Sequence, residues 1–199
     1  DVEFILDDAE QKIFSIGQRR TREGFAPIQE VLTETFEAIE LLSQHKGEVT
    51  GVPTFTDLDK LLSGLQKNDL IICAARPGMG KTSFCLNIAQ SAAVKQKKSV
   101  AIFSLEMSKE QVVQRMLSAQ AMINQQNLRT GFLKDDDWPR LTNAMGVLSE
   151  TSIFIDDTPA VTAMQVRSKA RRLKAEKGLD LVIIDYLQLM AGHRRTDNR

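Results

Sequence analysis

The sequence predicts an α/β fold, with a mostly parallel sheet that is flanked by helices and preceded by a helical segment. From about residue 50 onward, apolar runs typical of strands alternate with helical patterns. This alternation predicts a parallel sheet that is buried on both faces. The first apolar run also leads directly into a glycine-rich turn, G-M-G-K-T. The expected strands are residues 69–75, 99–105, 152–157 and 179–187.

Helix-start signals lie between these strands. Ser108 opens the pattern S-K-E-Q and Thr162 opens T-A-M-Q, and both patterns have the form of a capping box. Another helix is expected after residues 134–138, K-D-D-D-W, with an aspartate as its N-cap. The basic helix at 167–177 also carries apolar residues. We therefore expect its charged side chains to face solvent, with contact to DNA as the alternative.

The residues before position 50 are expected to be organised separately from the sheet. An apolar-periodic segment near the start ends in a charged run, G-Q-R-R-T-R-E-G, which is typical of a linker. Residues 27–45 predict a helix, because Pro27 suits its first turn and apolar residues recur at helical spacing. Such an apolar stripe packs either on the following domain or on a neighbouring subunit. The expected divisions of the chain are 1–24, 25–49 and 50–199.

The composition is that of an ordinary soluble protein, with 42% hydrophobic and 26% charged residues. Basic and acidic residues number 26 each, so net charge indicates no partner and does not exclude a nucleic acid. We expect a cytoplasmic protein, because no apolar run reaches the roughly 18 residues of a membrane-spanning helix and no signal sequence begins the chain. Asp1 at the start indicates a fragment or a processed product. Cys73 and Cys85 are expected to be small buried residues in a reducing compartment.

Residues 75–82, A-R-P-G-M-G-K-T, fit the phosphate-loop pattern G-x-x-x-x-G-K-[ST] except at the first position, which is alanine. Gly78 and Gly80 allow the chain to curl so that backbone N–H groups point at a phosphate. Lys81 can bridge the β- and γ-phosphates of ATP, and the Thr82 hydroxyl can bind Mg²⁺. The helix that starts there adds its positive N-terminal end. The expected nucleotide-binding residues are Arg76, Pro77, Gly78, Met79, Gly80, Lys81, Thr82 and Ser83.

A carboxylate for the magnesium ion is expected at the end of the last apolar run. L-V-I-I-D is typical of a central strand with Asp185 at its carboxyl end, where open α/β sheets bind their ligands. Asp156 and Asp157, which follow the shorter run I-F-I, compete for this role, although D-D-T-P is typical of a turn. The expected metal ligands are therefore Thr82 and Asp185.

The catalytic base must lie elsewhere, because Tyr186 follows Asp185 where many phosphate-loop ATPases have a glutamate. Glu106 comes at the end of the run A-I-F-S-L. There it would face the γ-phosphate and orient the attacking water. The alternative is an acidic residue that only stabilises the first turn of the next helix. We expect Glu106 and Lys81 to be the catalytic residues.

Several motifs closely resemble those of the bacterial replicative DNA helicase family, DnaB. They are A-R-P-G-M-G-K-T-S-F, F-S-L-E-M-S, I-I-D-Y-L-Q-L-M, T-G-V-P-T-F-T-D-L-D and N-L-R-T-G, and the resemblance covers about residues 25–199. It implies a RecA-like P-loop ATPase domain in a homohexameric ring that moves 5′→3′ along single-stranded DNA. It also implies ATP and Mg²⁺ as cofactors, and primase and a helicase loader as partners.

The same resemblance assigns roles to individual positions. Lys81 and Thr82 match the Walker A pair, Glu106 matches the catalytic glutamate, and Asp185 matches the Walker B acid. Residues 27–45 resemble the linker helix, which in the family packs on the adjacent subunit. Residues 1–16 would then be the tail of the family's N-terminal domain.

The sequence departs from the family pattern in two places. A glycine that the family usually has between threonine and phenylalanine is missing at Thr54–Phe55. The sequence also stops at A-G-H-R-R-T-D-N-R, where the family continues with further strands, a polar sensor, DNA-contacting loops and an arginine finger. Because an arginine finger contributes about 10³–10⁵-fold to the rate, we expect the 199-residue chain alone to hydrolyse ATP poorly.

Two other functions share this kind of site: a RecA- or RadA-type recombination ATPase, and a small-molecule kinase. The kinase is disfavoured, because the sequence shows no lid-like arginine-rich insertion. The linker-like helix at 27–45 favours a helicase over a recombination ATPase. The sequence therefore predicts an ATP-dependent replicative helicase motor, with the recombination ATPase as the alternative.

Overall fold

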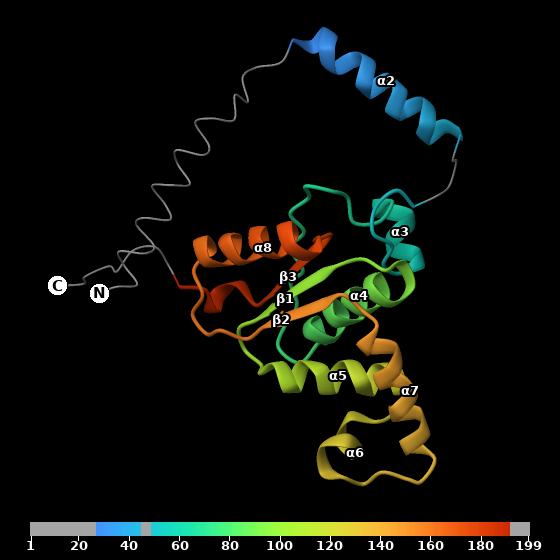
Figure 1. Ribbon diagram of the computed structural model, residues 1–199, viewed down its shortest axis with the longest axis vertical. Coiled ribbons are helices and arrows are strands. Elements are labelled where there is room, and N and C mark those ends of the chain that lie inside the picture. Colours follow the sequence, from blue (N-terminus) through green and yellow to red (C-terminus); the bar gives the residue numbers. More distant parts are fainter. Residues whose placement is uncertain (1–26, 45–48, 192–199) are drawn as a thin grey trace, which may run out of the picture. The chain divides into compact units, whose positions relative to one another are not determined.

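The computed structural model describes residues 27–44 and 49–191, so the segment expected at 1–24 lies outside the described residues. The chain forms two compact units, and the second begins at Val49. The described part of the first unit is helix α2 (Ile28–Gln44), which confirms the helix expected at 27–45 (Figure 1). The large apolar side chains of α2 are exposed, and they include Ile28, Leu32, Phe36 and Ile39.

The second unit is built on a parallel sheet whose strands lie in the order β2-β1-β3 (Figure 1). The three strands confirm the last three strands expected from the sequence. In the register of the sheet, Phe103 lies opposite Asp156 and Ser104 lies opposite Asp185. The carboxyl ends of all three strands therefore meet at one edge of the sheet. The strands are β1 (Val100–Ser104), β2 (Ile153–Asp156) and β3 (Leu181–Asp185).

Strand β1 is buried along its whole length because helices cover both faces of the sheet. Val100 and Ile102 point to one face, where they pack with apolar residues of helices α4 and α5. Ala101 and Phe103 point to the other face, where they pack with Val166 of helix α8. This alternation is what a strand requires when it is covered on both sides. The helices of this unit are α3 (Thr56–Leu62), α4 (Lys81–Gln96), α5 (Lys109–Ala121), α6 (Gln125–Thr130), α7 (Asp137–Ser149) and α8 (Ala163–Lys177), followed by the short 3₁₀ helix η1 (Leu187–Leu189).

The expected helix starts are largely confirmed. Ser108 and Thr162 each form a complete capping box at the start of α5 and α8. Helix α7 follows K-D-D-D-W as expected, and Asp136 occupies its N-cap, but that side chain makes no capping hydrogen bond. The neighbouring Asp137 instead accepts a hydrogen bond from the backbone N–H of Lys134. None of the helices in the described ranges is long and apolar enough to cross a membrane.

The basic helix α8 faces solvent with its charged side, as expected. Val166 is buried in the apolar cluster on this face of the sheet, and Leu173 packs against that cluster. Arg167, Arg171 and other charged residues of α8 are exposed.

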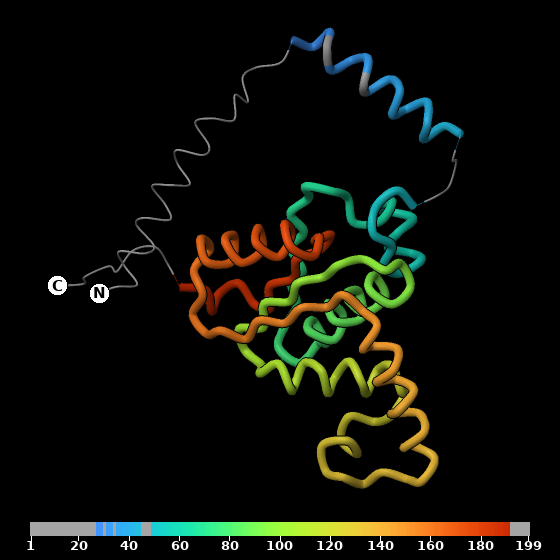
Figure 2. The backbone as a smooth tube through the Cα atoms, viewed as in Figure 1, coloured from blue at the N-terminus to red at the C-terminus, as the bar shows by residue number. Residues whose placement is uncertain are grey.

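The prediction of a strand at 69–75 is wrong. Residues 70–76 have no regular secondary structure and run as an extended segment into α4 (Figure 2). Leu70 and Ile72 are 89% and 77% exposed, and Cys73 is exposed as well. An apolar run becomes a buried strand only when its backbone groups pair with a neighbouring strand and its side chains are covered. Within residues 49–191 no strand pairs with this run, because the described sheet ends at β3. Its large apolar side chains are not covered either.

Candidate nucleotide site

The glycine-rich turn adopts the backbone conformation that its sequence predicts. Gly78 has φ of +78° and Gly80 has φ of +90°, both in the left-handed region that disfavours other residues. A Cβ atom at either position would meet nothing within 4 Å. Conformation, and not lack of space, is therefore the reason for glycine at these two positions. All residues from 76 to 80 are exposed, so the turn is open to a ligand.

Helix α4 presents its N-terminal end at this turn. Gly80 is its N-cap, and no side chain caps the first turn. The ladder of the helix begins with the bond from the Phe84 N–H to the Gly80 carbonyl, at 2.9 Å. The preceding N–H groups of a helix have no partner within the helix, and together with the helix dipole they favour an anion. The turn and the helix start thus form a single surface suited to phosphate.

Lys81 and Thr82, the first residues of α4, contact the end of strand β3. The Lys81 ammonium nitrogen lies 2.8 Å from Asp185 Oδ1, and the Thr82 hydroxyl donates to Asp185 Oδ2 at 2.6 Å. The same ammonium lies 4.4 Å from the centre of the Tyr186 ring. Asp185 is only 8% exposed. Residues that are about a hundred positions apart in sequence therefore meet at one point.

Glu106 lies beside this cluster. The Leu105 N–H donates to the Asp185 carbonyl at 2.8 Å, which holds the end of β1 against the end of β3. Glu106 follows directly and is exposed. Burial lowers the pKa of Lys81, but the hydrogen bond and charge of Asp185 and the charge of Glu106 outweigh it, so the pKa is raised and the ammonium stays protonated. Lys81, Glu106 and Asp185 thus converge from three segments.

The competing aspartates at the end of β2 have other partners. Asp156 Oδ2 lies 2.7 Å from the ammonium of Lys169 on α8. Asp157 accepts a hydrogen bond from the Lys109 N–H at 3.0 Å and pairs with that residue's ammonium at 3.9 Å. The structure therefore brings Asp185, and neither of these two, to the first turn of α4.

The cluster fits a magnesium ion that is held mainly by a nucleotide. No group of three or more histidine, cysteine, aspartate and glutamate side chains that could hold a metal occurs among the described residues. A dedicated protein cage of that kind is not what Mg²⁺ needs, because it is usually bound through one or two protein groups, phosphate oxygens and water. The Thr82 hydroxyl and the Asp185 carboxylate, 2.6 Å apart, provide two such oxygen groups.

Aromatic packing supports α4 behind the site. The Phe55 and Phe84 rings stack with their centres 5.2 Å apart. Just before Phe55, the Thr54 N–H and hydroxyl both donate to Asp59 of α3, at 2.8 and 2.7 Å from Oδ1. The junction where the family glycine is missing thus places an aromatic ring directly on the helix that carries Lys81.

Sequence reasoning missed two contacts at this site. In the sequence, Tyr186 is distinguished only by standing where many phosphate-loop ATPases have a glutamate, whereas in the structure its ring lies under the Lys81 ammonium. Cys73, expected to be buried, is exposed, while Cys85 is half-buried. Burial, together with the neighbouring Cys73 thiol, raises the pKa of Cys85 to about 11. The sequence gives no signal for the contact of Tyr186 with Lys81 or for that of Cys73 with Cys85, because each contact joins separate segments of the chain.

Comparison with known proteins places the chain in a family. Residues 51–199 match the family described as "DnaB-like helicase C terminal domain". The chain is 54% identical over its whole length to "Replicative DNA helicase DnaC" of Bacillus subtilis (strain 168), of which it covers 44%. It is 52% identical over its whole length to "Replicative DNA helicase DnaB" of Geobacillus stearothermophilus, again covering 44%. The chain thus spans less than half the length of these relatives.

Solved structures agree with this match. A structure described as an ATPase domain has a TM-score of 0.79 and 34% identity, over 88% of this chain and 62% of that one. A structure described as that of a DnaB-like replicative helicase and its interactions with primase has a TM-score of 0.76 and 32% identity, over 96% of this chain and 46% of that one. They confirm the expected RecA-like α/β fold, and the matches do not favour the recombination ATPase. The chain therefore belongs to the family of DnaB-like helicase C-terminal domains.

Proposed function

We propose that this chain is the ATP-driven motor of a replicative DNA helicase, which unwinds duplex DNA 5′→3′ at replication forks as a ring hexamer. The observation that carries the proposal is the meeting of Lys81, Thr82 and Asp185 at the N-terminal end of α4, with Glu106 beside them. The relatives named as replicative helicases support the reaction and its setting. The partners we propose are single-stranded DNA, primase and a helicase loader, and the location is the cytoplasm.

Each residue of the site has a chemical task in this proposal. The backbone N–H groups of the turn and of Lys81, Thr82 and Ser83 bind phosphate oxygens, and the Lys81 ammonium adds a positive charge. Thr82 and Asp185 would hold the magnesium ion, and the ion would supply positive charge to the phosphates. Glu106 accepts a hydrogen bond from the attacking water and takes its proton. Its exposed position at the end of β1 leaves room for that water.

Two variants test these roles separately. We expect Lys81→Ala to abolish ATP binding, measured by equilibrium dialysis with labelled ATP. We expect Glu106→Gln to bind ATP like the unchanged protein while hydrolysis by the complete gene product falls by about 10²–10⁴-fold. Glu176→Gln, an exposed glutamate on α8, is the matched control and should change neither quantity. Retained hydrolysis in Glu106→Gln contradicts its role, and strand exchange without 5′→3′ unwinding contradicts the helicase.

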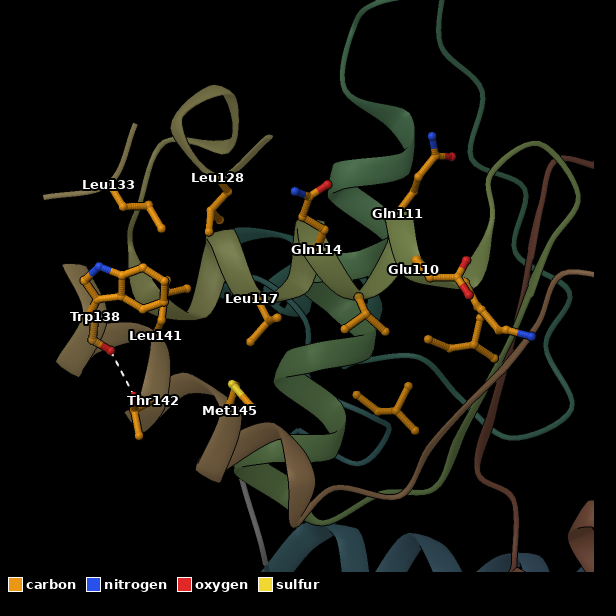
Figure 3. A pocket seen from close by; sticks show the side chains of 14 residues that line it. Glu110, Gln111, Gln114, Leu117, Leu128, Leu133, Trp138, Leu141, Thr142 and Met145 are labelled. Atoms are coloured by element: carbon orange, nitrogen blue, oxygen red, sulfur yellow. Dashed lines mark hydrogen bonds between the residues drawn. The ribbon is translucent and has the colours of Figure 1, made fainter. Parts of the chain in front are cut away.

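The hexamer proposal is supported by a groove in the second unit (Figure 3). The groove has a volume of about 910 Å³ and lies among α5, α6, α7 and the edge strand β2. Leu128, Leu133, Trp138 and Leu141 gather at one end of it in Figure 3. Trp138 is 60% exposed there. An exposed apolar surface of this kind marks an interaction site, and we propose that it receives α2 of a second copy.

Helix α2 suits that groove because its large apolar side chains are exposed. Its sequence also has no lysine or arginine that would repel Lys109 in the lining of the groove. We expect Phe36→Asp on α2 and Met145→Asp in the groove each to prevent hexamer formation, measured by sedimentation with nucleotide. Glu37→Gln, at a polar position of α2, should leave the hexamer intact. Trp138 is the sole tryptophan, so its emission should move to the blue only when the hexamer forms. Hexamers of both aspartate variants would contradict this docking.

A further inference from the structure

The Lys81 ammonium has partners on two sides at the end of β3. Asp185 Oδ1 lies 2.8 Å from it, and the centre of the Tyr186 ring lies 4.4 Å from it. A cation within about 6 Å of a ring face is attracted by the negative potential of that face. The Lys81 side chain is only 26% exposed, so water shields this attraction incompletely.

The Tyr186 ring is attached to regular structure on both sides. The preceding residue, Asp185, is paired with Ser104 of β1 in the sheet. The Tyr186 carbonyl accepts a hydrogen bond from the Leu189 N–H at 3.1 Å, at the start of η1. The backbone at Tyr186 is therefore fixed by the strand before it and by the 3₁₀ helix after it. The ring remains a partner at a defined place, whereas the flexible Lys81 side chain can change partners.

We propose that Tyr186 is a positioning residue that competes with nucleotide phosphates for the Lys81 ammonium. The inference rests on the proposed nucleotide-binding function and goes beyond it, because it assigns the tyrosine an effect opposite in sign to that of the glycine-rich turn. Phosphate oxygens carry full negative charge and attract an ammonium more strongly than a ring does. Binding therefore draws Lys81 toward the turn and away from the ring, and it frees Asp185 for the magnesium ion.

An interaction that is made before binding and lost on binding lowers affinity by its own strength. Replacing Tyr186 with leucine removes the ring, so we expect Tyr186→Leu to bind ATP about two- to fivefold more tightly. Tyr186→Phe keeps the ring face and should bind ATP as the unchanged protein does. If Tyr186 had a purely structural role, its replacement would weaken ATP binding, whereas we expect Tyr186→Leu to strengthen it.

A second measurement needs no change at the site beyond one fluorine. Tyr186 is the sole tyrosine of the 199-residue chain, so 3-fluorotyrosine gives one ¹⁹F resonance, which must vanish in Tyr186→Phe. Lys81→Met removes the ammonium and moves the resonance in one direction. We expect ATP with Mg²⁺ to move the resonance of the unchanged chain in that same direction, because the ammonium leaves the ring.

The outcomes separate this inference from the proposed function. ATP that binds, as measured by equilibrium dialysis, without moving the ¹⁹F resonance overturns the inference and leaves nucleotide binding standing. Weaker ATP binding by a folded Tyr186→Leu, with its thermal unfolding midpoint as the check, overturns it as well. If the unchanged protein does not bind ATP at all, the proposed function fails and the inference fails with it.

Discussion

Two lysine–aspartate pairs lie at the same edge of the sheet, on either side of β1, and they have different surroundings. Lys81 and Asp185 are 2.8 Å apart at the end of β3, and Lys169 and Asp156 are 2.7 Å apart at the end of β2. Distance alone does not distinguish them. The first lysine begins α4 directly after the glycine-rich turn, whereas the second lies within α8, two turns after the capping box of that helix.

A carboxylate at a strand end is therefore not a ligand site by itself. The Asp185 carboxylate receives the Thr82 hydroxyl as well as Lys81, and an aromatic ring and a second acidic residue lie nearby. Asp156 instead accepts a hydrogen bond from the Thr158 N–H, and Lys169 also donates to the Thr158 hydroxyl. The pair at β2 thus ties a turn to α8, while the pair at β3 faces the open end of a helix that favours anions.

The largest contrast is expected when each carboxylate is replaced by an amide. Asp185→Asn removes the charged group that we propose as a ligand of the magnesium nucleotide, so the affinity for the nucleotide should fall by about 10–100-fold. Asp156→Asn should leave that affinity within about twofold, because its partners are Lys169 and Thr158 and not the glycine-rich turn. Calorimetric titration with ATP and Mg²⁺ measures both. Equal losses in the two variants would show that the nucleotide does not distinguish these strand ends.

The sequence pattern was sufficient to predict this site in outline. A phosphate loop needs a lysine, a hydroxyl and a distant carboxylate, which predicts Lys81, Thr82 and Asp185, and these groups meet in the structure. Their roles toward a nucleotide remain predictions. The choice between Asp185 and Asp156 was harder, because both follow apolar strands. The shorter run before Asp156 and the turn pattern D-D-T-P favour Asp185, and the contacts of Asp185 with Lys81 and Thr82 of α4 bear out that preference.

The fold was predictable where an apolar run had partners within the described chain. The runs at 99–105, 152–157 and 179–187 form β1, β2 and β3. The run at 69–75 is equally apolar, yet no described strand pairs with it. Local sequence reports how well a segment suits a buried strand, but pairing depends on what lies beside it. The exposure of Trp138 is equally beyond local sequence, because it depends on which surface lies against the ring.

The smallest expected effect concerns the stability provided by the pair at β2. Burial raises the pKa of Asp156, but hydrogen bonds from Lys169 and Thr158 outweigh it, so its pKa lies below the ordinary value. Such a carboxylate stabilises the fold above the unfolded pKa near 3.9. That stabilisation is lost as the pH falls through the folded value. Asp156→Asn should therefore lower the free energy of unfolding by about 0.5–1 kcal/mol at neutral pH.

The pH dependence identifies the source of that stabilisation. Urea titrations of the unchanged protein and of Asp156→Asn should give a difference at neutral pH that disappears once the pH is below the lowered folded pKa of Asp156, because the carboxyl is then protonated in both states. Lys169→Met removes the main partner of the carboxylate and should reduce the same difference. A loss that persists undiminished in acid would mean that the side chain's shape, and not its charge, holds the turn to α8. The two strand ends would then differ in the kind of interaction they make as well as in their surroundings.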